Sequence, residues 1–309
     1  MGELCLNTFT FGTTGQNPFM NLLQTNIRKF KGIFILSLIA LVFFSGNIFK
    51  EKRYSASIVS FNIRFDNLDD GKNGWYYRKD SVAKYVLKYS TEIIGLQEVL
   101  VHQYNFLKEK WPQFKSYGVG REDGKLKGEM SPIFYDSSKY SLISAETKWL
   151  SETPDVPGKG FDAACERIVS IVWLYHKHLH DSVLVMNTHW DHEGKIARDK
   201  SADMMLNIAQ SALDAGQHVI MLGDFNAKPQ ESPIQKIKQK MLDSCPEEQL
   251  TSGTYNGWST FPMYSPHIDY IFYSKAFTKC SSYFISKIEF ADYRQLSDHY
   301  MIRTHLRYN

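Results

Sequence analysis

The sequence has few cysteines, and their spacing fits no metal or disulfide motif. Cys5, Cys165, Cys245 and Cys280 are the four cysteines among 309 residues, and no pair has the CxxC or Cys/His spacing of a zinc site. A disulfide framework and a structural zinc site are therefore not expected. Free cysteines are usually buried, so we expect these to act as small hydrophobic side chains.

Most of the chain also has no excess of basic or of acidic residues. The formal net charge is +3, but residues 1–50 hold four basic residues and one acidic residue, which leaves 32 basic and 32 acidic residues in the remainder. A continuous basic surface for gripping a long nucleic acid is therefore not expected, although a local basic patch stays open. With 43% hydrophobic and 14% aromatic residues, the chain can bury a large core, as an α/β domain of about 250 residues does.

One apolar run stands out near the N-terminus. Arg28, Lys29 and Lys31 precede the apolar residues 33–44, an order typical of an export signal. Continued to residue 49, the run approaches the roughly 20 residues of a membrane span, and no good small-x-small cleavage site follows, so an uncleaved anchor is the alternative. A buried core helix is a further alternative. We expect residues 1–50, with the apolar run 33–49, to be an export signal or membrane anchor that places the catalytic domain outside the cytoplasm.

Residues 54–309 alternate strand-like and helix-like segments. The apolar spacing predicts strands at 56–63 and 92–100 around a helix at 80–90, which is a β-α-β unit. Consecutive short strands follow between residues 117 and 176, and these favour antiparallel pairing. Further strands at 182–190 and 219–224 flank a helix at 197–216. The pattern predicts two packed mixed sheets with helices outside them.

Polar residues follow or interrupt apolar runs at six places, and they share one chemistry. They are Asn62, Glu98, His189, Asp224 with Asn226, Asp269, and Asp298 with His299. A lone polar residue at a strand end is usually a turn former, but six such places together are not explained in that way. Amide and carboxylate oxygens are ligands for Mg²⁺ or Mn²⁺, and histidines beside such an ion suit binding of a phosphate oxygen. The set therefore predicts metal-assisted hydrolysis of a phosphate ester.

The stretches that carry these residues resemble the endonuclease/exonuclease/phosphatase superfamily, which has the deoxyribonuclease-I-like fold. They are SFNIR, GLQEV, NTHWDH, GDFNAKP, HIDYIF and LSDH, in the family's order, over about residues 56–307. FDNLDDGKNGW, GVGREDGKLKGE and WLSETPDVPG are similar to a bacterial metal-dependent hydrolase branch related to deadenylase-like nucleases. The resemblance implies an α/β fold, a four-layer α/β/β/α sandwich of two packed mixed sheets with outer helices.

The resemblance also implies a role for each site residue. Mg²⁺ or Mn²⁺ would be held by Asn62, Glu98 and Asp298. Asp224 would orient or deprotonate the attacking water. Asn226, His189, His299 and Arg167 would bind the phosphate and stabilise its developing charge. Asp269 would polarise His299.

The substrate class is less sharply indicated. We expect a phosphodiester of single-stranded nucleic acid or a nucleotide, hydrolysed in one step by water; the alternatives are a sugar phosphomonoester, a phospholipid or sphingomyelin-type diester, and a noncatalytic binding module. No protein partner is implied, and membrane association would come through residues 33–49. Arg121 and Glu129 lie in a polar segment, for which a solvated position is the commoner outcome. Aromatic residues that would stack on a substrate or pack in the core are Trp75, Tyr76, Tyr77, Trp149, Trp190 and Trp258.

Overall fold

A computed structural model describes residues 54–287 and 295–309. They belong to one compact unit, Arg53–Asn309. The expected export signal or anchor, with its apolar run 33–49, lies outside the described residues. Among the helices within the described ranges, none is long and apolar enough to cross a membrane.

Within residues 54–287 and 295–309, the strands form two sheets of six strands each. The first has the order β11 (Phe277–Ser286), β12 (Met301–Tyr308), β1 (Ser55–Asn62), β2 (Ile93–Gln97), β4 (Ile133–Asp136) and β3 (Phe114–Tyr117). The second has the order β5 (Tyr140–Trp149), β6 (Ile168–His176), β7 (Asp181–His189), β8 (His218–Asp224), β10 (Asp269–Tyr273) and β9 (Leu242–Asp243). Both sheets are mixed, because β1 with β2 and β7 with β8 are parallel pairs and their other pairs are antiparallel.

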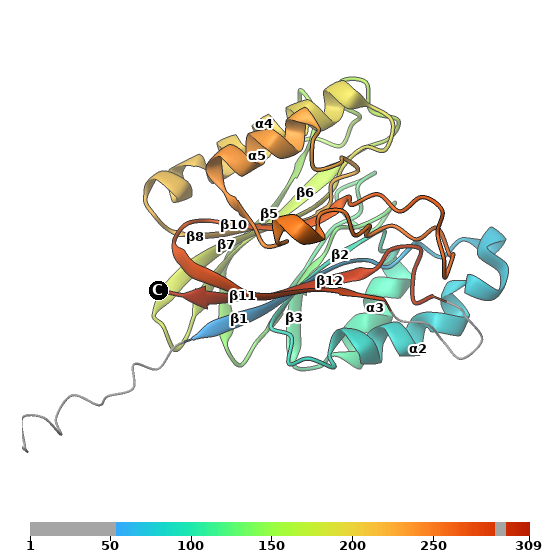
Figure 1. Cartoon of the computed structure of the whole chain (residues 1–309), viewed down its shortest axis with the longest axis horizontal. Coiled ribbons are helices and arrows are strands. Elements are labelled where there is room, and N and C mark those ends of the chain that lie inside the picture. Colours follow the sequence, from blue (N-terminus) through green and yellow to red (C-terminus); the bar gives the residue numbers. More distant parts are fainter. Residues whose placement is uncertain (1–53, 288–294) are drawn as a thin grey trace, which may run out of the picture. The chain divides into compact units, whose positions relative to one another are not determined.

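Helices cover the outer face of each sheet (Figure 1). They are α2 (Trp75–Val86), α3 (Val101–Lys110), α4 (Lys195–Asp214) and α5 (Ser232–Lys240). The short 3₁₀ helices η1 (Leu68–Asn73) and η2 (Glu247–Gln249) contribute no buried residues to these layers. Figure 1 shows α4 and α5 over the sheet of β5 to β10, and α2 and α3 against the other sheet. This arrangement has four layers, in the order α/β/β/α.

Alternation along the strands produces these layers. In β1, Ile58 packs in the cluster between the two sheets, whereas Val59 packs in the cluster beneath α2 and α3. In β8, Leu222 faces the inter-sheet cluster and Met221 faces α4 and α5. Successive side chains of a strand point to opposite faces, so a continuous apolar run serves a strand that is covered on both sides. The predicted four-layer sandwich is confirmed.

Several element boundaries predicted from the sequence were wrong. Helix α2 begins at Trp75, whereas the predicted helix began at residue 80. The prediction missed the first turns because their exposed tyrosines and the buried Arg78 break the apolar spacing of a helix. A strand was expected near 117–122, but β3 ends at Tyr117. The two glycines that follow are closely packed: a side chain at Gly118 would collide with Pro132, and one at Gly120 with the backbone of Lys127. The two-residue β9 was not predicted.

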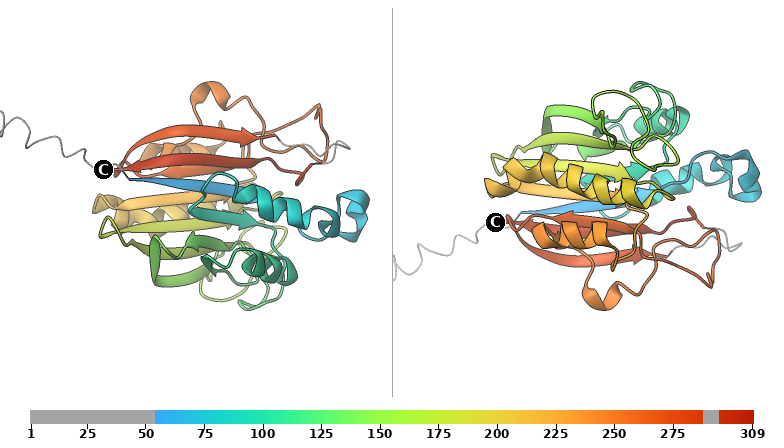
Figure 2. Two further views of the ribbon diagram at one scale, coloured as in Figure 1. Left: turned by 90° about the horizontal axis from the view of Figure 1, so that it is seen from below. Right: turned by 90° about the horizontal axis from the view of Figure 1, so that it is seen from above.

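Strand pairing brings the predicted site residues together. In the register of the second sheet, His189 of β7 and Asp269 of β10 both pair with Asp224 of β8. In the first sheet, Asn62 pairs with Gln97, next to Glu98. Figure 2 shows the C-terminus at the end of the sheets opposite to η1, which follows β1. The site residues therefore gather at the sheet end remote from the C-terminus.

Candidate active site

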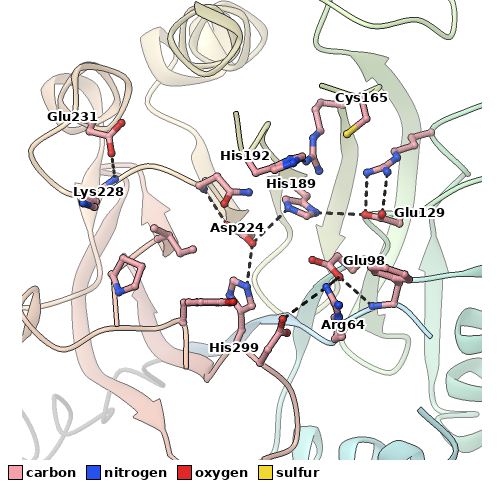
Figure 3. Close-up of a pocket in the computed structure, with 18 of the residues that line it drawn as sticks. Arg64, Glu98, Glu129, Cys165, His189, His192, Asp224, Lys228, Glu231 and His299 are labelled. Atoms are coloured by element: carbon pink, nitrogen blue, oxygen red, sulfur yellow. Dashed lines mark hydrogen bonds and ion pairs between the residues drawn. The ribbon is translucent and has the colours of Figure 1, made fainter. Parts of the chain in front are cut away.

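A cavity of about 510 Å³ lies where β2, β7 and β8 end (Figure 3). Seven of the predicted site residues line it: Glu98, Arg167, His189, Asp224, Asn226, Asp298 and His299. The other two, Asn62 and Asp269, are buried directly behind this wall, each bonded to a lining residue. The structure thus brings all nine predicted residues to one place.

Asp224 lies at the centre of the site. Its Oδ2 atom accepts a hydrogen bond from the amide of Asn62 at 3.0 Å and lies 3.6 Å from Nε2 of both His189 and His299. Its Oδ1 accepts from the backbone N–H of Asn226 at 3.0 Å. Burial raises the pKa of Asp224 and the adjacent His299 lowers it, with a net rise. A buried carboxylate with a raised pKa and convergent donors suits the orientation of a water and acceptance of its proton.

His299 is held by a second carboxylate. Its Nδ1 lies 2.9 Å from Oδ2 of Asp269, and both side chains are buried. Burial opposes a charge on this ring, but the carboxylates of Asp269 and Asp224 outweigh it and raise the pKa of His299 well above its usual value. The ring is therefore an imidazolium whose Nε2–H faces Asp224 and the cavity.

His189 has the opposite electrostatic character. Its Nε2 faces Asp224, while its Nδ1 lies 3.7 Å from Oε2 of Glu129. Burial, followed by the nearby charge of Arg167, lowers the pKa of His189 to about 3. The two histidines on either side of Asp224 thus differ: His299 is charged and His189 is neutral.

Glu98 and Asp298 form the carboxylate pair predicted to hold a metal. Nη1 of Arg64 lies 3.9 Å from an oxygen of each, so the two carboxylates face a common cation position. Asn62 donates to Glu98 at 3.0 Å as well as to Asp224, and its own oxygen accepts from the backbone N–H of Arg64 at 3.0 Å. Asn62 therefore fixes the carboxylates of Glu98 and Asp224 relative to one another.

The donor set fits a hard divalent cation. The cavity is lined by five carboxylates, from Glu98, Glu129, Asp224, Glu231 and Asp298, but by only four lysine or arginine side chains. With the imidazolium of His299 the charges of the wall balance, so the wall alone gives a phosphate anion no net attraction, and a divalent ion at the oxygens of Glu98 and Asp298 would make the cavity positive. Ligand atoms of Asp224, Asp269 and His299 also lie within 4.8 Å of one another, but Nδ1 of His299 is bonded to Asp269.

Local backbone conformation presents these groups. Glu98 and Asn226 have φ values of +59° and +45°, which non-glycine residues adopt rarely and which cluster at functional sites. Gly223, with φ of +150°, precedes Asp224, and a Cβ there would lie 2.1 Å from the carbonyl oxygen of Thr188. The glycine of GDFN is therefore required where β8 pairs closely with β7.

Arg167 is in the cavity wall and largely immobilised. Its Nε lies 3.3 Å from Oδ2 of Asp191, and its Nη2 lies 2.9 Å from Nδ1 of His192. Asp191 also accepts backbone N–H groups from Ala164, Glu193 and Gly194. Burial opposes this charge, but these hydrogen bonds and Arg167 lower the pKa of Asp191 below its usual value. Asp191 and His192 thus brace Arg167 beside His189.

The expectation for cysteines holds in part. Cys165, Cys245 and Cys280 are cysteines outside any disulfide bond. Cys245 is buried, as expected, whereas Cys165 is half-buried and lines the cavity beside Arg167. Burial raises the pKa of Cys165, which keeps it a thiol.

Sequence reasoning missed or undervalued several wall residues. Arg121 and Glu129, for which solvation was the commoner expectation, form a two-bond ion pair at 2.9 Å in the wall. Their motif is polar and non-periodic, so hydrophobic spacing gave no signal. Lining residues that were not predicted are Arg64, Phe65, His192, Lys228, Glu231, Tyr255, Tyr264, Pro266 and Ile268.

The aromatic residues predicted as stacking candidates lie outside the cavity wall. Trp75, Trp149 and Trp190 are buried, and Tyr76 and Tyr77 are exposed on α2. Phe65, Tyr255 and Tyr264 supply the aromatic surface of the cavity instead. Any stacking on a substrate would therefore involve different aromatic residues from those expected.

Comparison with known proteins agrees with this geometry. An endonuclease/exonuclease/phosphatase family model matches residues 59–299. The solved structure of a protein of this family from Bacteroides thetaiotaomicron is 31% identical, with a TM-score of 0.77, and the match covers 84% of this chain and 99% of that one. The mannosyl-6-phosphatase from the same bacterium is 32% identical, with a TM-score of 0.76 and coverage of 81% and 99%.

A more distant likeness leads to nucleases. The probable RNA exonuclease NGL3 of Saccharomyces cerevisiae is 26% identical over 185 residues, which cover 54% of this chain and 35% of that protein. The chain thus spans about a third of the length of this curated relative. On the family match and on the two bacterial relatives, the chain belongs to the endonuclease/exonuclease/phosphatase family.

Proposed function

We propose that the protein is a divalent-metal-dependent phosphoesterase that hydrolyses a small phosphorylated substrate, and that a sugar phosphomonoester is the best-supported class. One observation carries the phosphoesterase function: Asn62, His189 and His299 converge on Oδ2 of Asp224. The carboxylates of Glu98 and Asp298 lie beside this cluster. Such a cluster suits a phosphoryl group in the cavity and a water beside Asp224.

The mechanism is a single in-line displacement. The water oxygen attacks phosphorus, its proton passes to Asp224, and the bond from phosphorus to the leaving oxygen breaks. The leaving oxygen takes up a proton from solvent and Asp224 releases its proton to solvent, so phosphate and a free alcohol result. His299 as an imidazolium, His189 through Nε2 and Asn226 through its amide donate to the phosphoryl oxygens as negative charge builds. Mg²⁺ or Mn²⁺, held by Glu98 and Asp298 with Asn62 behind them, would supply further charge neutralisation.

Two observations favour a small monoester over the diester that the sequence suggested first. The described unit follows a segment that carries the chain's excess positive charge, so residues 51–309 have no net charge with which to hold a long polyanion. The mannosyl-6-phosphatase is 32% identical and its match covers 81% of this chain, whereas the exonuclease NGL3 is 26% identical and its match covers 54% of this chain. A phosphodiester of single-stranded nucleic acid or a nucleotide is the second candidate, supported by that exonuclease likeness.

The location of the protein stays a prediction. The basic residues before the apolar run 33–49 support an exported or membrane-anchored protein whose catalytic domain acts outside the cytoplasm. A small sugar phosphate is compatible with such a location. Fractionation of the expressing cell, with detection of the C-terminal domain, tests this prediction.

Paired chromogenic substrates test the reaction class. Hydrolysis of p-nitrophenyl phosphate and of bis-p-nitrophenyl phosphate would be measured with Mg²⁺ or Mn²⁺, with and without chelator. We expect metal-dependent turnover that is faster on the monoester, followed by turnover of mannose 6-phosphate above that of an RNA oligonucleotide. Faster turnover of the diester would select the second candidate, and turnover of neither compound or of any phosphoester tried would indicate a noncatalytic binding module.

A further inference from the structure

A small void lies beside the Nδ1 edge of His189, on the side of the ring away from Asp224. Its volume is about 10 Å³, and Arg121, Glu129, Glu166 and Arg167 are among the residues that enclose it with His189. Two arginines and two glutamates give this wall no formal net charge, which favours a neutral occupant over an ion. The volume is about that needed for one water molecule.

Three buried nitrogen atoms of the wall residues have no hydrogen-bond partner within the described part of the chain. They are Nε of Arg121, Nη1 of Arg167 and Nδ1 of His189. The guanidinium groups are fixed by other contacts, since Arg121 grips both oxygens of Glu129 at 2.9 Å and Arg167 is held by Asp191 at 3.3 Å. A buried polar group without a partner costs about 1–3 kcal/mol, so a ligand that satisfies all three is strongly favoured.

We propose that the void binds one ordered water that accepts hydrogen bonds from Arg121 and Arg167 and donates one to Nδ1 of His189. Such a water has the two to four polar partners that buried waters typically have. Arg121 and Arg167 then act as positioning residues through His189. This assigns Arg167 a role different from the direct phosphate contact that the sequence suggested.

The consequence is a defined tautomer of His189. With Nδ1 as an acceptor, the single proton of the neutral ring sits on Nε2, which lies 3.6 Å from Oδ2 of Asp224. Nε2–H is then the donor that a phosphoryl oxygen requires. The opposite tautomer would aim Nδ1–H at Glu129, 3.7 Å away and already bonded twice by Arg121, and would turn the Nε2 lone pair toward the Asp224 carboxylate. That arrangement places two acceptors face to face.

Nitrogen NMR of the protein labelled with ¹⁵N-histidine tests the tautomer directly. The signal of His189 would be assigned by its loss in His189→Gln, and the protonated ring nitrogen identified from its couplings to the ring carbon-bound protons. We expect a neutral ring protonated at Nε2. A ring protonated at Nδ1, or at both nitrogens near pH 7, would overturn the proposal. Because this measurement needs no turnover, its failure is distinguishable from failure of the proposed function.

Substitution of the water's ligands tests the link to catalysis, and this arm rests on the proposed function. Arg121→Met should lower kcat about 10- to 100-fold, as loss of such supporting groups does, with a smaller change in KM, and should shift His189 toward the Nδ1–H form. Arg303→Met is the control, because Arg303 is a buried arginine of β12 that stacks on Tyr89 and does not line the cavity. It should leave kcat and the His189 signal unchanged. An Arg121→Met protein that is folded and keeps both the wild-type tautomer and the wild-type kcat would overturn the proposal.

A crystal structure of the unmodified protein, at a resolution that places waters, supplies a second measurement. Density for a water within hydrogen-bond distance of Nε of Arg121, Nη1 of Arg167 and Nδ1 of His189 is the expected result. A dry void, or a water that does not contact His189, would overturn the proposal.

Discussion

Asp269→Asn isolates the charge behind His299 while keeping the shape of the site. Nδ1 of His299 donates to Asp269 across 2.9 Å, and the two side chains are 5% and 1% exposed, so solvent hardly screens the bond. A hydrogen bond that involves a charged partner contributes about 1.5–3 kcal/mol. At about 1.36 kcal/mol for each tenfold change in rate, its loss from the transition state lowers kcat about 10- to 100-fold. Asn can still accept from Nδ1, so Asp269→Ala should be slower again.

The assay is steady-state hydrolysis of p-nitrophenyl phosphate at saturating Mg²⁺, with folding checked by circular dichroism. Asp243→Asn is the matched control, because Asp243 is a partly buried aspartate of the same sheet that does not line the cavity. It should keep the wild-type kcat. Our reasoning on His299 would be refuted by a folded Asp269→Asn protein whose kcat stays within about threefold of wild type, since losing a preorganised charge-stabilising group typically costs far more.

Three further outcomes are expected. Glu98→Ala and His299→Ala should each lower kcat by at least about 100-fold with the fold intact, and a folded variant with full turnover would contradict its assigned role. Chelation with EDTA should abolish turnover, and added Mg²⁺ or Mn²⁺ should restore it; full activity after exhaustive chelation would exclude metal dependence. Burial lowers the pKa of His176 to about 4, so the folded state binds its proton more weakly than the unfolded state, and stability falls as the pH drops from about 6.5 toward 4. Urea unfolding at pH 7 and pH 5 should therefore show a loss of stability about 1–2 kcal/mol smaller in His176→Asn than in wild type, because solvent hardly screens this buried ring, and equal losses would refute this account.

The sandwich and the centre of the site could be predicted because both depend on strand periodicity. An apolar run such as that before Asp224 marks a strand covered on both faces, and the polar residue at its end then lies at the sheet edge. The strand register does the rest, since it pairs both His189 and Asp269 with Asp224. No long-range information beyond strand order is needed to predict that these three side chains meet.

The wall of the cavity could not be predicted in the same way. Arg121 and Glu129 lie in a loop between β3 and β4, where no period relates sequence position to side-chain direction. Arg64 adopts a φ of +59° after β1, and this backbone turn, which the residue type does not announce, directs it between Glu98 and Asp298. Sequence-based expectations for polar loops default to solvent, and functional sites are where that default fails.

The unequal histidines explain why the supporting groups differ on the two sides of Asp224. Burial opposes a charge on His299, but the carboxylates of Asp269 and Asp224 outweigh it and keep a proton on both ring nitrogens, so Nε2 is a donor. A second imidazolium at His189 would hold the proton-accepting Asp224 in a strongly ion-paired state and weaken it as a base. Burial of the ring, together with the nearby charge of Arg167, prevents this charge, and a neutral ring then needs its one proton on the correct nitrogen. The site therefore requires a tautomer-selecting device on the His189 side alone, which is where Arg121 and Arg167 lie.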